Sequence, residues 1–137
     1  MFLAAFSFLA SALFAQHPNI VIDASGGADE PSICIDPKNT NRIVAGSNID
    51  NVYYSTDAGR SWTKKRQSST FGVYGDPVIV CDTAGAFYHF HLSNPSFGSW
   101  IDRIVGQKST DGGKNLEQWR VYGSQWHKKS RQTLDFD

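Results

Sequence analysis

Residues 55–62 read Ser-Thr-Asp-Ala-Gly-Arg-Ser-Trp, and this octapeptide is the most informative segment for the fold. The Asp57 carboxylate can accept hydrogen bonds from backbone amides across a hairpin turn. Gly59 supplies the positive φ that such a turn needs. Trp62 offers a large apolar face to the adjacent strands. The octapeptide therefore predicts a tight turn between two antiparallel strands.

Two pairs of similar segments indicate an internal repeat. Residues 109–113 read Ser-Thr-Asp-Gly-Gly and begin 54 residues after the first turn, although Leu116 stands where Trp is expected. Residues 30–36 (EPSICID) resemble residues 76–82 (DPVIVCD), and in both an acid and a proline lead into an apolar strand that ends at Asp. Units of about fifty residues that fit four short antiparallel strands are typical of β-propeller blades.

Alternation of apolar and polar residues predicts the strands. Expected strands lie at 32–36, 42–47, 52–55 and 61–64 in the first unit, and from 77, at 87–92 and at 103–108 in the second, whose fourth strand is unassigned. Period-two alternation places Tyr88, Phe90 and Leu92 on one face, and Phe87, His89 and His91 on the other. The predicted fold class is all-β, an incomplete β-propeller of about two four-stranded blades, because a closed ring needs about four to eight.

The N-terminal residues are expected to form a signal peptide. Residues 1–15 carry no charged side chain, are rich in Phe, Leu and Ala, and are too short to span a bilayer. Small residues at 10–12, or Ala15, offer cleavage points. This predicts a secreted, periplasmic or cell-surface protein with no membrane span after cleavage. The alternative is a buried apolar N-terminal helix.

The blades are expected within residues 20–115. Beyond Asn115 the alternation fades, so residues 116–137 are expected to be an irregular or aberrant tail. A frameshifted or truncated gene product would explain both the fading pattern and the missing second Trp.

The octapeptide fits the pattern Ser-x-Asp-x-Gly-x-Ser/Thr-Trp, and it resembles the Asp box, the bacterial neuraminidase repeat of sialidases and their relatives. In that family the Asp box lies between the third and fourth strands of a blade, away from the active site. The resemblance therefore implies a sialidase-like propeller and an architectural role for seven residues: Ser55, Asp57, Gly59, Trp62, Ser109, Asp111 and Gly113.

Family sialidases bind the substrate carboxylate with three arginines, and they use an aspartate acid/base and a tyrosine–glutamate nucleophile pair. By the resemblance, the first arginine position falls on Asp29 or Glu30, and the acid/base position falls near Asn48, with Asp50 two residues away. Two function classes therefore remain open. One is an exported, non-catalytic propeller that binds a glycan or glycoprotein. The other is the N-terminal part of an exo-α-sialidase whose remaining blades are absent from this chain, with Asp50 and Asp76 as catalytic candidates.

Candidate ligand-binding residues lie where the two units begin. Glu30 and Asp76 are expected to project near the same rim, with Asn48 and Asp50 close by, and they could form a carbohydrate or cation site. The alternative is that these acids cap strand ends. Tyr74 precedes Asp76 and could stack on a sugar, or it could be an ordinary turn aromatic.

Other function classes are not favoured. Thirteen basic and thirteen acidic residues cancel, and the one basic run, residues 64–66, suits a solvated strand end, so no nucleic-acid partner is expected. His89 and His91 share a strand face without an evident third ligand, so no metal or other cofactor is predicted. Export would permit a disulfide between Cys34 and Cys81, but their apolar surroundings favour buried free thiols.

Overall fold

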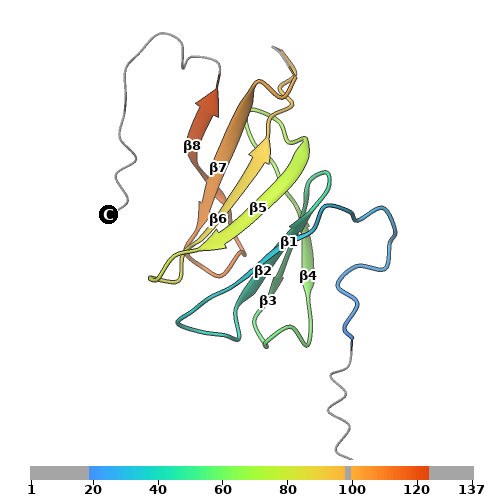
Figure 1. Ribbon diagram of the computed structural model, residues 1–137, viewed down its shortest axis with the longest axis vertical. Coiled ribbons are helices and arrows are strands. Elements are labelled where there is room, and N and C mark those ends of the chain that lie inside the picture. Colours follow the sequence, from blue (N-terminus) through green and yellow to red (C-terminus); the bar gives the residue numbers. More distant parts are fainter. Residues whose placement is uncertain (1–18, 98–99, 124–137) are drawn as a thin grey trace, which may run out of the picture.

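The computed structural model describes residues 19–97 and 100–123, which form eight β-strands in two four-stranded antiparallel sheets (Figure 1). The predicted all-β class is confirmed. Regular structure in this part of the chain is entirely strand, and no helix there is long and apolar enough to cross a membrane. The expected signal peptide at residues 1–15 lies outside the described residues.

The first sheet has the order β1-β2-β3-β4, so each strand pairs with the next one in the chain. Its strands are β1 (Ser32–Ile35), β2 (Ile43–Ser47), β3 (Asn51–Ser55) and β4 (Thr63–Arg66). The register pairs Cys34 with Val44 and Val44 with Tyr54. Because side chains alternate across a strand, these three residues share the face that meets the second sheet.

The second sheet repeats this meander in the order β5-β6-β7-β8. Its strands are β5 (Gly75–Cys81), β6 (Phe87–Leu92), β7 (Arg103–Ser109) and β8 (Glu117–Gly123). The expectation that the tail is irregular from residue 116 is wrong for residues 117–123, since they pair with β7 across a register shift at Gly106. The shift interrupts the alternation and so hides the strand from the sequence pattern. Residues 124–137 lie outside the described part.

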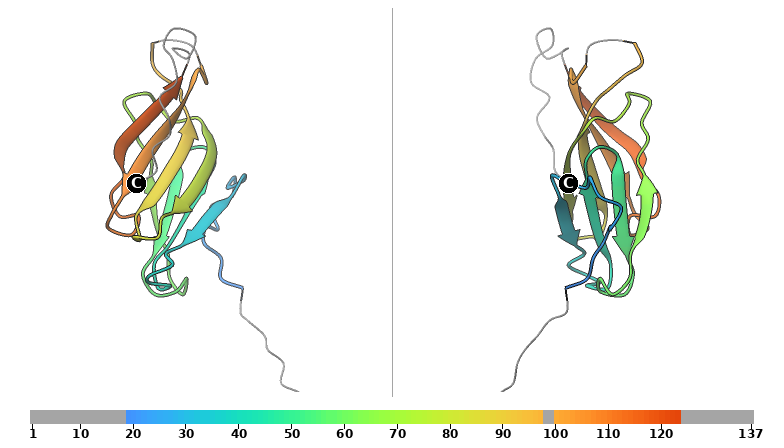
Figure 2. Two further views of the ribbon diagram at one scale, coloured as in Figure 1. Left: turned by 60° about the vertical axis from the view of Figure 1, so that its left-hand side comes forward. Right: turned by 90° about the vertical axis from the view of Figure 1, so that its right-hand side faces the viewer.

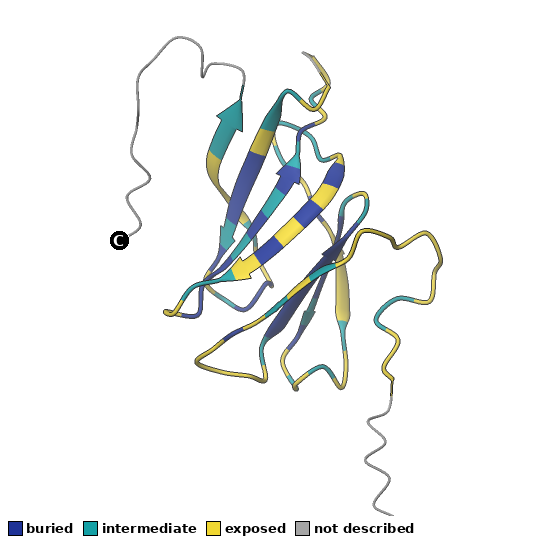
Figure 3. Ribbon diagram, in the orientation of Figure 1, coloured by how far each residue is buried: buried dark blue, intermediate teal, exposed yellow. Residues whose placement is uncertain are grey.

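The two sheets pack through β5, which contacts both β1 and β2. The core between the sheets consists of Val44, Val52, Ile79 and Phe87. Val and Ile suit the pleated surface because their branched side chains fill the space between neighbouring strands. Figure 3 shows the result on β5, where buried and exposed residues alternate along the strand.

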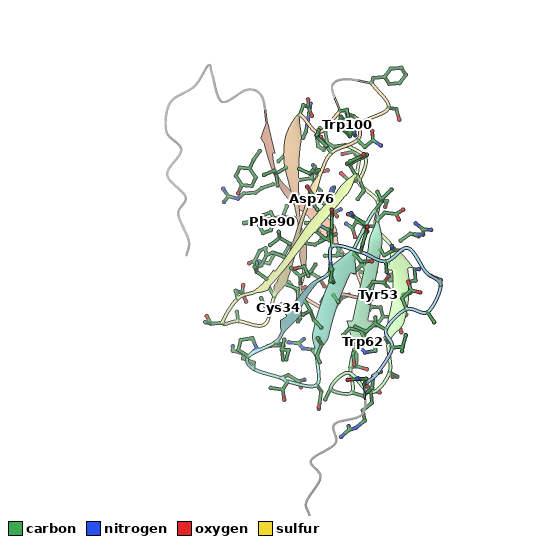
Figure 4. The ribbon with its side chains drawn as sticks, turned by 45° about the vertical axis from the view of Figure 1, so that its right-hand side comes forward. Cys34, Tyr53, Trp62, Asp76, Phe90 and Trp100 are labelled. Atoms are coloured by element: carbon green, nitrogen blue, oxygen red, sulfur yellow. The ribbon has the colours of Figure 1, made fainter. Side chains whose placement is uncertain are left out.

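Both cysteines lie at the edge of this core as half-buried free thiols. Burial raises the pKa of the Cys81 thiol to about 11. The prediction of free thiols is confirmed, although burial is partial. Figure 4 shows Cys34 on the first sheet.

An N-terminal segment crosses the outer face of the first sheet, the face turned away from the second (Figure 2). Asp23 anchors this segment. Its carboxylate accepts a hydrogen bond of 2.7 Å from the Tyr53 hydroxyl. It also forms an ion pair with Lys64, whose Nζ lies 2.6 Å away. The Lys64 ammonium, together with Ser25, holds the pKa of Asp23 well below its usual range. The segment therefore lies over β3 and β4.

Candidate functional site

The first tight turn joins β3 to β4 through its own side chains. Ser55 Oγ accepts a hydrogen bond of 2.9 Å from the Gly59 amide, and Asp57 Oδ1 accepts one of 2.9 Å from the Ser61 amide. Hydrogen bonds from Ser61, and then from Ser55, lower the pKa of Asp57 to about 2. The Trp62 indole donates to the Gly59 carbonyl at 3.0 Å. The turn's polar groups are thus engaged locally.

The second turn, between β7 and β8, repeats these bonds. Ser109 Oγ accepts from the Gly113 amide at 2.9 Å, and Asp111 Oδ1 accepts from the Asn115 amide at 2.9 Å. Leu116, in place of a tryptophan, packs against the hydrophobic core. Gly113 has a φ of 88°, and a Cβ there would lie 2.5 Å from a Val44 methyl. This turn therefore covers the first sheet.

At the opposite end of the sheets, Asn48 joins the two acids that begin the repeated units. Its Nδ2 donates to a Glu30 carboxylate oxygen, and its Oδ1 accepts from the Asp76 amide at 3.0 Å. Glu30 and Asp76 both have a positive φ, 50° and 48°. Gly75 is required beside them because a Cβ there would overlap the Asn48 amide oxygen. The structure thus brings Glu30, Asn48 and Asp76 together.

The Asp76 side chain acts on the neighbouring carboxyl group of Glu30. The interaction with Asp76 raises the pKa of Glu30, while the hydrogen bond from the Asn48 amide acts in the opposite direction. Both ends of the acidic pair are exposed to solvent. Asp50 does not join the pair but makes an ion pair with Arg66.

A polar hollow of about 680 Å³ adjoins this acidic pair. Loop residues 25–27 and Asp29 form one side, and β4 forms another with Lys64 and Arg66. Asn48, Ile49, Asn51 and Tyr74 complete the lining. The Tyr74 ring is held edge-on by Trp100, with ring centroids 4.8 Å apart. The hollow therefore combines cations, amides and one aromatic ring.

Asn51 leaves a hydrogen-bond acceptor unused beside this hollow. The residue is only 7% exposed. Its Nδ2 donates to the Asn48 carbonyl, while its Oδ1 has no partner. Buried polar atoms are normally satisfied, so this unpaired oxygen is an exception among the described residues.

Sequence reasoning found only part of this site. Glu30, Asn48 and Tyr74 lie at or beside the hollow, as do Lys64 and Arg66, which the sequence pattern assigned to a solvated strand end. The three consecutive cations of β4 carry no signal that an N-terminal loop packs beside them. Asn51 likewise resembles any turn residue in the sequence.

His89 and His91 lie between the sheets, on the buried face of β6. Their ring centroids are 5.6 Å apart, and burial, with a smaller effect of His91, lowers the pKa of His89 to about 3. Both His89 ring nitrogens lack partners. Residues 19–97 and 100–123 contain no group of three potential metal ligands. The pair therefore packs as neutral rings.

No protein-family model, curated protein or solved structure matches this chain. Function must therefore be argued from the residues and their geometry.

Proposed function

We propose that this chain is an exported, non-catalytic glycan-binding protein whose two sheets are neighbouring blades of a sialidase-like propeller. The observation that carries the proposal is the polar hollow of about 680 Å³ at the end of the sheets opposite the tight turns. Glycans and glycoproteins are the partners expected for such a site.

Support for the blade arrangement comes from the repeat. Both units are four-stranded meanders with the same turn between their third and fourth strands. The first strands of the two units lie side by side, and the Ile79 amide donates to Ser32 Oγ at 2.9 Å. Each sheet needs a neighbour on both faces, which is the packing rule of a propeller.

The chemistry of the hollow suits a polyhydroxylated ligand. Lys64 and Arg66 offer donors to sugar hydroxyls, while Asp29 and the half-buried Asn48 offer acceptors. Tyr74, steadied by Trp100, offers an aromatic surface. The hollow is more polar than most small-molecule sites, which suits a ligand covered with hydroxyl groups.

The acidic pair does not suit glycoside hydrolysis. Glycosidase carboxyls stand about 5–5.5 Å apart in retaining enzymes and farther apart in inverting ones. The Glu30 carboxylate accepts a hydrogen bond from Asn48, and the neighbouring Asp76 raises the pKa of Glu30, so Glu30 is already engaged within the chain. Asp50 is held by Arg66, and Asn48 cannot donate a carboxylic proton. Binding without turnover is therefore the better hypothesis.

Binding to a glycan array by the full chain tests the proposal. Removing one charged hydrogen bond costs about 1.5–3 kcal/mol, so Arg66→Ala should weaken binding by roughly tenfold or more. Lys65→Ala is the matched control, because Lys65 bonds the Lys114 carbonyl instead of lining the hollow. Equal binding by both variants would contradict the assigned site.

The second candidate function is an exo-α-sialidase activity, which the two Asp-box-like turns favour. A fluorogenic sialoside distinguishes the two functions. Release of the fluorophore by the full chain, abolished in Asp76→Asn, would establish hydrolysis. Glycan binding without release would establish the binding module.

A further inference from the structure

Among residues 19–97 and 100–123, the face of the second sheet that is turned away from the first is largely apolar and exposed, with the Lys108 ammonium over the Tyr88 ring. Val78 and Val80 of β5 are 50% and 42% exposed, and Ile104 of β7 is 47% exposed. Trp119 contacts the rings of Tyr88 and Phe90 on the same face. Figure 4 shows Phe90 on the side away from the first sheet. We call this surface, made of Val78, Val80, Tyr88, Phe90, Ile104 and Trp119, the trailing face.

The corresponding positions of the first sheet are covered within the chain. Val80 pairs with Tyr88 across β5 and β6, as Cys34 pairs with Val44 across β1 and β2. Val44 is fully buried because the second sheet packs against it. The trailing face therefore repeats, position for position, a surface that the first sheet buries under another four-stranded sheet.

The first sheet also presents the matching half of this interface. In the second sheet, Ile79 of β5 points toward the first sheet and is 5% exposed. Its equivalent on β1 is Ile33, which is 57% exposed, and Ile35, which corresponds to Cys81, is 52% exposed on the same face. The N-terminal segment crosses β3 and β4 and leaves these two side chains open. We call the surface of Ile33 and Ile35 the leading face.

We propose that the chain binds a second copy of itself head to tail, with the leading face of one copy on the trailing face of the next. The contact continues the β1–β5 interface already present within the chain, with β1 of the neighbour in the place that β5 takes on the first sheet. Within the chain, Leu116 of the second unit packs on the core at Val44. In the proposed contact, Trp62 of the neighbour takes the equivalent position on the trailing face.

Because the two faces differ, the contact is heterologous, and it forms a ring or an open chain of copies. Propellers close at about four to eight blades, which corresponds to roughly two to four copies of this chain. The arrangement buries two apolar surfaces that isolated copies leave in water. It does not depend on glycan binding at the hollow.

Sedimentation of the full chain over a range of concentrations tests the proposal, with one charge placed on each face. Val80→Glu should block the trailing face and Ile33→Glu the leading face, so each variant alone should sediment as a monomer. Mixed together, they should form a one-to-one complex, because each retains the face that the other has lost. Ile101→Glu, in the loop before β7, is the matched control and should assemble like the unaltered chain.

Several results would overturn the inference. One is an unaltered chain that stays monomeric at every concentration, and another is continued self-association of Ile33→Glu through two trailing faces. The third is a mixture of the two variants that stays monomeric although both have the circular dichroism of the unaltered chain. Should a variant not fold, hydrogen exchange on the unaltered chain replaces it. Protection must then rise with concentration at both 33–35 and 78–80, and a rise at neither or at one alone also refutes the contact.

Discussion

Acidification should destabilise this protein well before its carboxylates titrate, because two neutral histidines are buried between the sheets. His89 is 2% exposed, and its pKa is lowered from 6.5 to about 3 by burial, with a smaller contribution from His91. Burial lowers the pKa of His91 as well. Among the described residues, His91 is the one titratable neighbour whose charge acts on His89.

The sign and size follow from linkage. A depressed histidine pKa means that the unfolded chain binds the proton first, so stability is fully present above pH 6.5 and falls as the pH drops toward 3. One pKa unit corresponds to about 1.4 kcal/mol. His89 alone should therefore make the free energy of unfolding about 2 kcal/mol lower at pH 5 than at pH 8, and His91 acts in the same direction.

Urea unfolding of the full chain at pH 8, 6.5, 5.5 and 5 measures this effect. The carboxylates with lowered pKa, such as Asp57, destabilise the fold only near and below the ordinary carboxyl range, so they do not account for loss in this window. His89→Phe keeps the ring and removes the proton site, and it should reduce the pH slope by about one proton. A free energy that stays level from pH 8 to pH 5, or a slope unchanged in His89→Phe, would show that His89 is not buried as a neutral ring.

Three further predictions concern the turns and the core. Gly113→Ala should lower the free energy of unfolding by about 1–3 kcal/mol or more, because of its positive φ and its clash with the first sheet. Gly26→Ala has a similar φ but open space around it, so it should lower the free energy by less. Equal losses in urea unfolding would refute the packing argument. Ser55→Ala and Ser109→Ala should each cost about 1–3 kcal/mol by the same assay, because each buried hydroxyl accepts an amide hydrogen bond of the same length; a neutral change at either would exclude the turn geometry. The Cys81 thiol should react with iodoacetamide at pH 8 roughly a hundredfold more slowly in the folded chain than in urea, as followed by peptide mass spectrometry, and similar rates would show that it is not desolvated.

Much of the candidate site was beyond sequence reasoning for a physical reason. The equivalence of Glu30 and Asp76 is visible in the repeat, and the structure brings the two together through Asn48. That Asp50 turns to Arg66 instead depends on the pairing of β3 with β4. The unused Asn51 acceptor exists only because the surrounding loops bury it.

The turns and the strand alternation follow from short stretches of sequence alone. Ser55, Asp57 and Gly59 bond one another within five residues, so no distant contact is needed to form the hairpin. The alternation in β6 likewise follows from side chains pointing to opposite sides of any strand. Such features are local, and a local pattern can specify them.

Which face of each strand is buried, and which residues cover it, depends on how the two sheets and the loops pack together. β8 forms because β7 is beside it, despite a register shift that erases its pattern. His89 loses its charge because the first sheet covers it, and Lys64 reaches Asp23 because the N-terminal segment crosses the sheet. Burial and long-range strand pairing depend on residues far away in the chain, so the sequence of a short segment cannot predict them.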